Sequence, residues 1–509
     1  MRVAIIGQGP RGVYALAELL ARWPDDRTLE VHCYDPQLPG CGAAYHLAQP
    51  DYLRLNVSPR IVHLPPNPPL VEWLHRRGVD PQADVPRRLV GAYLAEAREA
   101  LLRDPRPGVT VTLHTAAVEY LSHEQGTGWL VAADMPQVVD EVLLAVGHCP
   151  SHDHQLANSW ADDRIRLVDG VYPVQDKLSL EAVPPGSQVA VRGASLTFID
   201  VVLALVEGRA PQDRPRVIRP IARTGLLMGV KPAVGADLLP DEELMVQTFV
   251  RTMPSDPNGV LDTVRTVATQ LLVLGGETAT HAARQVELTL QLGCEPDLDG
   301  PGRALRSLHR SIAVAEGAER PGAGAMLGRA WQALYPTIVA RLSYSRPDAA
   351  AWQRFLAAAA VLEKFAFGPL LPNAIRLAGL CQRGVVDLSW LEGGVRATDR
   401  LEGLPPDAEL PDVIVDAVLS PPGAVTARHP LVDQLLAEGR LRLAEGQRGV
   451  DVTRQAQCLA ADGLPTPGLS AVGRVAEDVV IGHDTLSRGL HPEIGQWAER
   501  ITQHQEAHR

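Results

Sequence analysis

The sequence predicts an α/β fold of two domains that each contain a βαβ unit, with a helical segment inserted into the second. Three observations support this prediction. A strand, a glycine-rich turn and a helix open the 509-residue chain at residues 2–20, and a similar strand and turn recur at residues 188–197. Residues 237–383 then carry long helical patterns rich in alanine and leucine. Together these features predict a two-dinucleotide-binding, Rossmann-like architecture with a helical insertion.

The first unit carries the stronger signal. A buried strand, residues 2–6, runs into G-x-G-x-x-G, in which Gly7 makes a tight turn, Gly9 admits a pyrophosphate, and Gly12 lets the helix pack closely. A second strand then ends on Asp35, which would accept hydrogen bonds from a ribose hydroxyl. The alternative, a glycine-rich turn without a ligand, fits this strand–turn–helix context poorly.

Composition limits the class of protein. The chain is long enough for two or three domains, with 46% apolar and 21% charged residues. A net charge of −12 without a basic block excludes nucleic acid and anionic membrane as expected partners. No secretion signal or apolar run of membrane-spanning length is present, so we expect a cytoplasmic protein.

The six cysteines do not form a close pair with redox or zinc spacing. We therefore expect neither a thiol–disulfide reductase nor a metal site. These cysteines are Cys33, Cys41, Cys149, Cys294, Cys381 and Cys458.

Between the two units, an irregular segment containing Asn56 and a proline-dense run at 65–69 follow the first motif. Such a segment is a candidate cradle for a cofactor ring, and an ordinary surface loop is the alternative. Helices are predicted at 70–77 and 87–103, and strands at 109–121, 128–133 and 139–145. The last of these strands leads to Gly147, where we expect the chain to leave the first domain.

The second unit carries a weaker sequence signal, because it has fewer glycines in its turn. Its strand, residues 188–192, is followed by Gly193, Ser195, Leu196 and Thr197, so only one glycine of the fingerprint is kept. An NAD(P) site is favoured, because this turn follows a complete first unit. A plain βα turn is the alternative.

The helical segment is predicted from a 3.6-residue period, with helices at 262–274, 304–316, 329–342, 349–365 and 373–383. A short strand at 413–419 returns to the second sheet. We therefore predict an FAD-binding domain at 1–150 and 425–509, an NAD(P)-binding domain at 151–236 and 400–424, and a helical insertion at 237–399.

The C-terminal tail carries Gly473 and then Asp484 and Thr485, followed by a predicted helix through Trp497. This pattern suits a segment that closes an FAD site over the ribityl chain and phosphate, with Asp484 as its acid. A helix N-cap at Asp484 or Thr485 is equally compatible with the pattern.

Taken together, these pieces resemble the bacterial FAD–NAD(P)-binding flavoprotein family over nearly the whole chain. The motifs that carry the resemblance are GQGPRG (7–12), DP (35–36), LRLNVSP (53–59), PRRLVGAYL (86–94), LLAVGH (143–148), GASLTFID (193–200), ARTG (222–225), FGPLLPNAIRL (367–377) and GHDTLSRGLH (482–491). The usual proline of the FGPLLPNAIRL motif is Leu370 here. The resemblance implies FAD and NADPH, with NADH possible, and an oxidoreductase. Some members are similar to monooxygenases that N-hydroxylate amino acids such as aspartate in natural-product pathways.

From these motifs we predict one set of cofactor contacts: Gly7, Gly9, Pro10, Arg11, Gly12, Asp35, Asn56, Gly147, Gly193, Ser195, Leu196, Thr197, Arg223, Gly473, Asp484 and Thr485. Arg192, Arg219, Arg223 and Lys231 are the basic residues near the second motif, where one would bind an NADPH 2′-phosphate. His148 and His483 lie beside expected flavin loops. Lys231 and Arg376 are candidate anchors for a substrate carboxylate, and no residue is assigned to catalysis.

The predicted activity transfers hydride from nicotinamide to flavin and then activates oxygen to hydroxylate a small amine. The helical insertion would act as a lid or as a homodimer surface. Two alternatives stay open: an NAD(P)H:acceptor oxidoreductase that oxygenates nothing, and an FAD-binding protein without catalysis.

Overall fold

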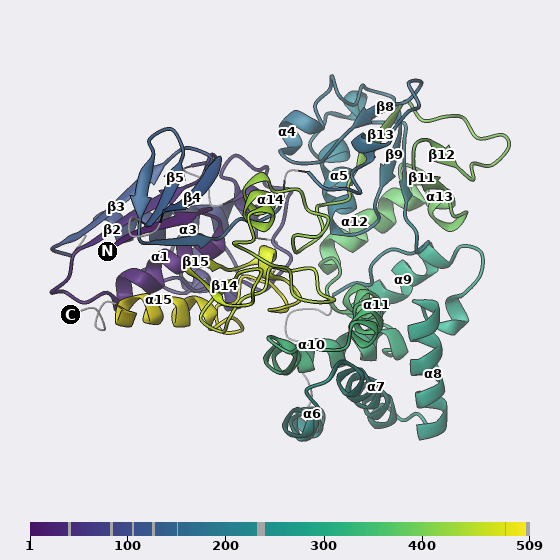
Figure 1. Ribbon diagram of the computed structural model, residues 1–509. Coiled ribbons are helices and arrows are strands. Elements are labelled where there is room, and N and C mark those ends of the chain that lie inside the picture. Colours follow the sequence, from purple (N-terminus) through teal and green to yellow (C-terminus); the bar gives the residue numbers. More distant parts are fainter. Residues whose placement is uncertain are drawn as a thin grey trace. The chain divides into compact units, whose positions relative to one another are not determined.

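The chain folds into two compact units, each with its own sheet of mainly parallel strands (Figure 1). The computed structural model describes residues 1–38, 42–81, 85–103, 106–124, 128–149, 151–231, 240–483 and 485–504. The first unit comprises Met1–Asp153, Leu342–Arg346 and Ser420–Arg509, and the second comprises His154–Arg341 and Pro347–Leu419. The helical segment therefore shares a unit with the second sheet, and the cofactors assigned to each unit remain predictions.

The first unit is built on a six-stranded sheet with the order β14-β15-β7-β1-β2-β3. Its strands are β1 (Arg2–Ile6), β2 (Leu29–Tyr34), β3 (Val109–His114), β7 (Glu141–Leu144), β14 (Gln457–Leu459) and β15 (Pro465–Ala471). All neighbours run parallel except β14, which pairs antiparallel with β15. Because both faces of the sheet are covered, its central strands are almost wholly apolar.

Different elements cover the two faces. One core joins the sheet to helices α1 (Pro10–Arg22), α2 (Leu70–His75), α3 (Arg87–Arg103) and α15 (Glu493–His504). The other core joins it to α14 (Pro430–Ala437) and to a small antiparallel sheet of β4 (Tyr120–Glu124), β5 (Gly128–Ala132) and β6 (Gln137–Val139).

The second unit contains a four-stranded parallel sheet with the order β10-β9-β13-β8. Its strands are β8 (Arg166–Val168), β9 (Gln188–Arg192), β10 (Val217–Ile221) and β13 (Val413–Asp416). Helix α5 (Leu196–Val206) connects β9 to β10 and is buried along most of its length. The predicted α/β fold class with two such units and a helical segment is confirmed.

The remaining elements of the second unit are mostly helical. They are α4 (Val174–Lys177), α6 (Pro240–Thr252), α7 (Pro257–Leu274), α8 (Ala279–Leu292), α9 (Arg303–Ala315), α10 (Ala323–Leu342), α11 (Ala349–Ala366), α12 (Leu371–Gln382), α13 (Ser389–Glu392) and the short strands β11 (Arg396–Ala397) and β12 (Leu401–Glu402). Four of these helices were not expected: the long helices α6 and α8 and the four-residue helices α4 and α13. In α8 only Ala282, Val286 and Thr289 are buried, so its apolar stripe is too thin to stand out in the sequence.

Two strand predictions need correction. The region 109–121 is not continuous strand, because β3 ends at His114 and β4 belongs to the small sheet. The strand at 139–145 is divided at Asp140 between β6 and β7. There the Asp140 backbone N–H donates to the Arg2 carbonyl at 2.8 Å, while its carboxylate accepts from the Arg2 N–H at 2.7 Å. Asp140 thus marks the point where the chain passes from one sheet to the other.

The C-terminal helix also differs from the prediction. It begins at Glu493 rather than directly after Thr485, so Thr485 is not its N-cap. Asp484 lies outside the described residues. Among the described residues no single helix is long and apolar enough to cross a membrane, and only the pair α11 and α12, bent by 87°, passes that test together.

Candidate functional site

The first glycine turn lies at the carboxyl end of β1, where parallel α/β sheets bind nucleotides. Gly7 has φ +102°, and a Cβ atom there would lie 2.4 Å from the Ala145 carbonyl oxygen. A Cβ atom on Gly12 would lie 1.9 Å from the Gly7 carbonyl oxygen. Gly7 and Gly12 are therefore required by the packing of the protein itself.

Gly9 differs from its two neighbours. The nearest atom to a Cβ built on Gly9 is the Gly42 Cα atom, at 3.9 Å. Helix α1 begins at Pro10 and has no side-chain cap, so its first backbone N–H groups remain available. The turn consequently has open space beside Gly9 and donors suited to an anion such as a pyrophosphate.

Asp35 supports this turn directly. One carboxylate oxygen accepts the Gln8 N–H at 2.8 Å and the other accepts the Gln37 N–H at 2.8 Å. The side chain belongs to a residue that is only 8% exposed. Because each carboxylate oxygen has a second lone pair, Asp35 can hold the turn and still accept from a ribose hydroxyl.

Arg11 binds a different partner from the one expected. Its guanidinium donates to the Thr485 carbonyl at 3.1 Å and lies 3.0 Å from Nδ1 of His491. The Tyr14 hydroxyl donates to the Leu486 carbonyl at 3.0 Å. These contacts hold the C-terminal segment on α1 from Thr485 onward. They give Arg11 a bracing role, and its contact with a cofactor remains a prediction.

Two stacked imidazoles sit in this segment, with the His483 and His491 rings 4.8 Å apart. Burial lowers the pKa of His491 to about 4 and that of His483 well below its usual value, and the Arg11 charge adds to both shifts. Both rings are therefore neutral at neutral pH. The Glu477 carboxylate accepts the N–H groups of Gly482 and His483, which fixes the start of the segment.

Three further predicted contacts lie in loops of the first unit. Gly147 is exposed, and a Cβ atom there would meet nothing within 4 Å. Gly473 is buried with φ +84° and would bring a Cβ atom to 3.5 Å from Arg11 Cγ. Asn56 is half-buried, and His148 is exposed next to Gly147. Gly147 follows β7, so it is placed at the same sheet edge as the glycine turn.

The second turn reproduces the backbone of the first. Gly193 has φ +115° and its N–H donates to Ile221 at 2.8 Å, as the Gly7 N–H donates to Tyr34 at 2.8 Å. Ser195 is exposed and provides no side-chain cap for α5, while Leu196 and Thr197 are half-buried in its first turn. This helix start is therefore also open to an anion.

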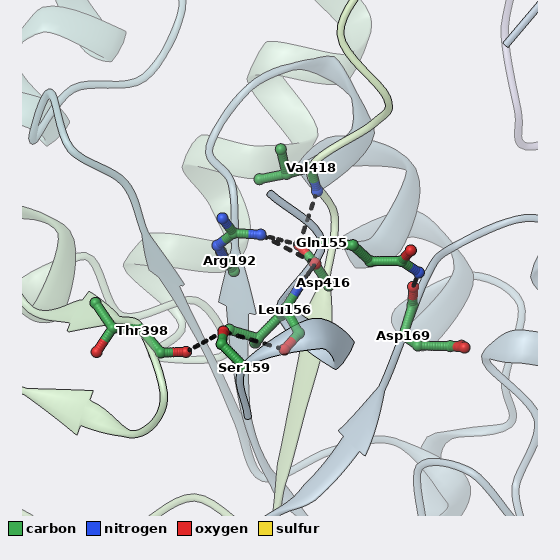
Figure 2. A network of polar contacts seen from close by, with 8 residues as sticks. All are labelled: Gln155, Leu156, Ser159, Asp169, Arg192, Thr398, Asp416 and Val418. Atoms are coloured by element: carbon green, nitrogen blue, oxygen red, sulfur yellow. Dashed lines mark hydrogen bonds and ion pairs between the residues drawn. The ribbon is translucent and has the colours of Figure 1, made fainter. Parts of the chain in front are cut away.

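A buried ion pair lies beneath the second turn (Figure 2). Nη1 of Arg192 contacts both Asp416 carboxylate oxygens, at 2.9 and 3.0 Å. The same carboxylate accepts the Leu156 N–H at 2.7 Å and the Val418 N–H at 3.2 Å. Asp416 was not predicted, although an acid at the end of an apolar strand is a visible signal. It neutralises Arg192 and ties three segments together.

The two arginines considered for the 2′-phosphate occupy different surroundings. Arg219 lies in β10, where its Nε donates to Asp387 at 2.8 Å and Nη1 to Gln188 at 2.9 Å. Arg223 is exposed on the turn that follows β10. Only Arg223 is therefore placed at the carboxyl end of that strand.

The two candidate substrate anchors are also distinguishable. Arg376 pairs with Glu207 at 3.4 Å and donates to Asn373 at 2.9 Å, so it links α12 to the end of α5. This pairing argues against a substrate carboxylate at Arg376. The Lys231 ammonium lies 5.7 Å from the centre of the Phe367 ring.

A cleft of about 710 Å³ opens elsewhere in the second unit. It is lined by Gln188 and Val217, the first residues of β9 and β10, and by Arg219 and Asp387. It therefore lies at the amino ends of the strands, whereas nucleotides bind outside the carboxyl ends. Sequence patterns contain no signal for this cleft.

A profile described as FAD-NAD(P)-binding matches residues 4–149, the stretch that contains the first turn and Asp35. Over these residues, the chain is similar to the FAD-NAD(P)-binding family. The FAD-NAD(P)-binding region is followed by the second glycine turn, which lies outside the matched residues.

Two curated relatives match part of the chain. The nitrosuccinic acid synthase npaA of Aspergillus oryzae is 31% identical over 232 residues, which is 41% of this chain and 35% of that protein. An L-aspartate N-monooxygenase (nitrosuccinate-forming) of Streptomyces davaonensis is 25% identical over 254 residues, 41% of this chain and 39% of that protein. The match thus spans well under half the length of each relative. Among solved structures, an L-lysine 6-monooxygenase from Pseudomonas syringae aligns over 99% of both chains with 12% identity and a TM-score of 0.48.

Proposed function

We propose that the protein is an FAD-dependent, NADPH-consuming monooxygenase that hydroxylates the nitrogen of a small amine, such as the amino group of aspartate. The observation that carries this proposal is the presence of two matching strand–turn–helix sites in one chain. The relative named as an L-aspartate N-monooxygenase supports the choice of nitrogen and of an acidic amino acid.

The residues of the first unit fit FAD. The open space at Gly9 and the uncapped start of α1 suit its pyrophosphate, and Asp35 suits its ribose. In the second unit, the turn from Gly193 to Thr197 suits the pyrophosphate of NADPH, with Arg223 beside its ribose. Bound FAD would supply the redox chemistry, accepting a hydride from nicotinamide and delivering electrons to oxygen.

The chain's own contribution is to bind, orient and exclude water. Arg11, Tyr14 and Glu477 hold the segment from Gly482 onward against α1. Because His483 and His491 are buried and neutral, these two imidazoles add no charge beside the first site. A cytoplasmic location, small-molecule partners with oxygen, and a homodimer remain predictions.

The test is a screen of NADPH oxidation by the purified protein over amino acids, with peroxide detection and mass spectrometry of each amine. We expect an acidic amino acid to accelerate NADPH oxidation and to gain oxygen. NADPH oxidation that yields only peroxide, with every amine unchanged, would contradict the proposal.

A second candidate is an NAD(P)H:acceptor oxidoreductase without oxygen insertion. One observation favours it: Arg376, a candidate anchor for a substrate carboxylate, is paired with Glu207. Under this alternative, an added electron acceptor would consume NADPH faster than any amine does. An FAD-binding protein without catalysis would consume none.

A further inference from the structure

The end of α11 is attached to the segment that follows β10. The Gly229 N–H donates to the Lys364 carbonyl at 2.9 Å, and the Lys231 N–H donates to the Pro369 carbonyl at 2.9 Å. A Cβ atom on Gly368 would lie 1.7 Å from the Gly229 carbonyl oxygen, so the two backbones touch. The last turn of α11 is therefore fixed to the segment at Gly229 and Lys231, which follows the turn that carries Arg223.

Two positively charged side chains, Lys364 and Arg223, influence each other in this region. Lys364 is half-buried in the last turn of α11, and both burial and the Arg223 charge lower its pKa. Within the described part of the chain, no carboxylate pairs with either side chain. Two neighbouring cations without a counter-ion raise the energy of the protein unless an anion binds between them.

The position defines which anion is suitable. The Ile221 carbonyl at the end of β10 accepts the Gly193 N–H, so Arg223 follows the strand that borders the glycine turn. In a βαβ nucleotide site, the residue after this strand lies beside the 2′ position of the adenosine ribose. The corresponding residue in the first unit, Asp35, is replaced here by Ala222, which cannot accept from a ribose hydroxyl.

We propose that Lys364, from the helical segment, binds the ribose 2′-phosphate of NADPH together with Arg223. This inference rests on the proposed nucleotide site of the second unit. It gives the helical segment a role in cofactor selection: α11 supplies a point charge and the β10 turn supplies a guanidinium, which together match a phosphate dianion.

The experiment measures binding of 2′,5′-ADP and 5′-AMP to the FAD-loaded protein by calorimetry. We expect 2′,5′-ADP to bind the unaltered protein more tightly than 5′-AMP. The Lys364→Gln variant should lose at least about tenfold in affinity for 2′,5′-ADP, the loss typical of one charge-assisted hydrogen bond, and should bind 5′-AMP unchanged. Lys364→Arg should retain most of the preference.

Arg354 provides the matched control, because it is an exposed cation on the same helix. Arg354→Gln removes the same charge and should leave both affinities unchanged. Equal losses of 2′,5′-ADP and 5′-AMP in Lys364→Gln, or no loss, would overturn the role of Lys364 while the nucleotide site stands. If the unaltered protein binds neither ligand, the nucleotide site itself fails, and this inference fails with it.

Discussion

The two glycine turns have nearly the same backbone and very different side chains. In the first unit the Ala145 N–H donates to Ile6 at 2.8 Å, and in the second the Ala417 N–H donates to Arg192 at 2.9 Å. The paired strand ends are Ile6 with Leu144 in one unit and Arg192 with Asp416 in the other.

This comparison separates two requirements. Each turn needs one glycine at positive φ, Gly7 or Gly193, because the chain must reverse direction next to a neighbouring strand. The position of Gly12 is taken by the fully buried Phe198, so the second helix does not touch its strand in the same way. The two turns thus share their backbone, and they differ in the residues that follow β2 and β10, which are Asp35 in one unit and Ala222 with Arg223 in the other.

The largest effect is expected for Gly9→Val. Its side chain would occupy the open space beside the turn, so the purified protein should contain no FAD, because the pyrophosphate loses its place. Flavin absorbance measures the outcome. Gly170→Val is the control, because a Cβ atom there also meets nothing within 4 Å, and it should keep its flavin. If the Gly9→Val protein is yellow, it has kept its flavin, and the first turn does not bind the pyrophosphate as proposed.

Asp416→Ala tests the ion pair of the second unit. It leaves Arg192 without its carboxylate and should lower the free energy of unfolding of that unit by about 3–5 kcal/mol. Urea unfolding measures the loss. A double variant, Arg192→Ile with Asp416→Leu, reproduces the apolar pair of the first unit and should recover part of the stability. If the double variant is no more stable to urea than Asp416→Ala, the strand ends of the two units are not equivalent.

Arg223→Ala tests whether the residue that follows β10 selects the dinucleotide. We expect it to weaken NADPH binding by about 1.5–3 kcal/mol relative to NADH, because a charge-assisted contact is lost. Arg219→Ala is the matched control, since Arg219 is paired with Asp387, and the preference should not change. Fluorescence titration with both dinucleotides provides the measurement. If Arg219→Ala changes the preference and Arg223→Ala does not, the 2′-phosphate binds at Arg219 instead.

The histidine pair belongs to the first unit alone and predicts a pH dependence. The pKa of His491 is about 4 in the folded protein, below its usual value of about 6.5, so the unfolded chain binds the proton first as pH falls. The resulting stability is complete above pH ~6.5 and declines towards pH ~4, with a loss of about 2 kcal/mol at pH ~5. Thermal unfolding across this range checks the slope. His491→Gln should flatten it, and an unchanged slope would contradict the assignment.

Much of the fold could be predicted because its signals are local. The strand at 2–6, the turn up to Gly12 and the helix at 87–103 each depend on neighbouring residues, and each lies where the sequence predicts it. The division at Asp140 could not be predicted, because it depends on a hydrogen bond to Arg2, far away in the chain. Helix α8 was missed because few of its residues are buried.

The sequence by itself determined where the two glycine turns lie, because glycine, strand and helix signals act over a few residues. The tertiary structure decided what the charged side chains do. Arg11 binds Thr485, Arg219 binds Asp387, and the charge of Arg223 lowers the pKa of Lys364, and in each case the partner lies more than a hundred residues away. A charged residue acts according to what surrounds it, and those surroundings exist only once the chain has folded.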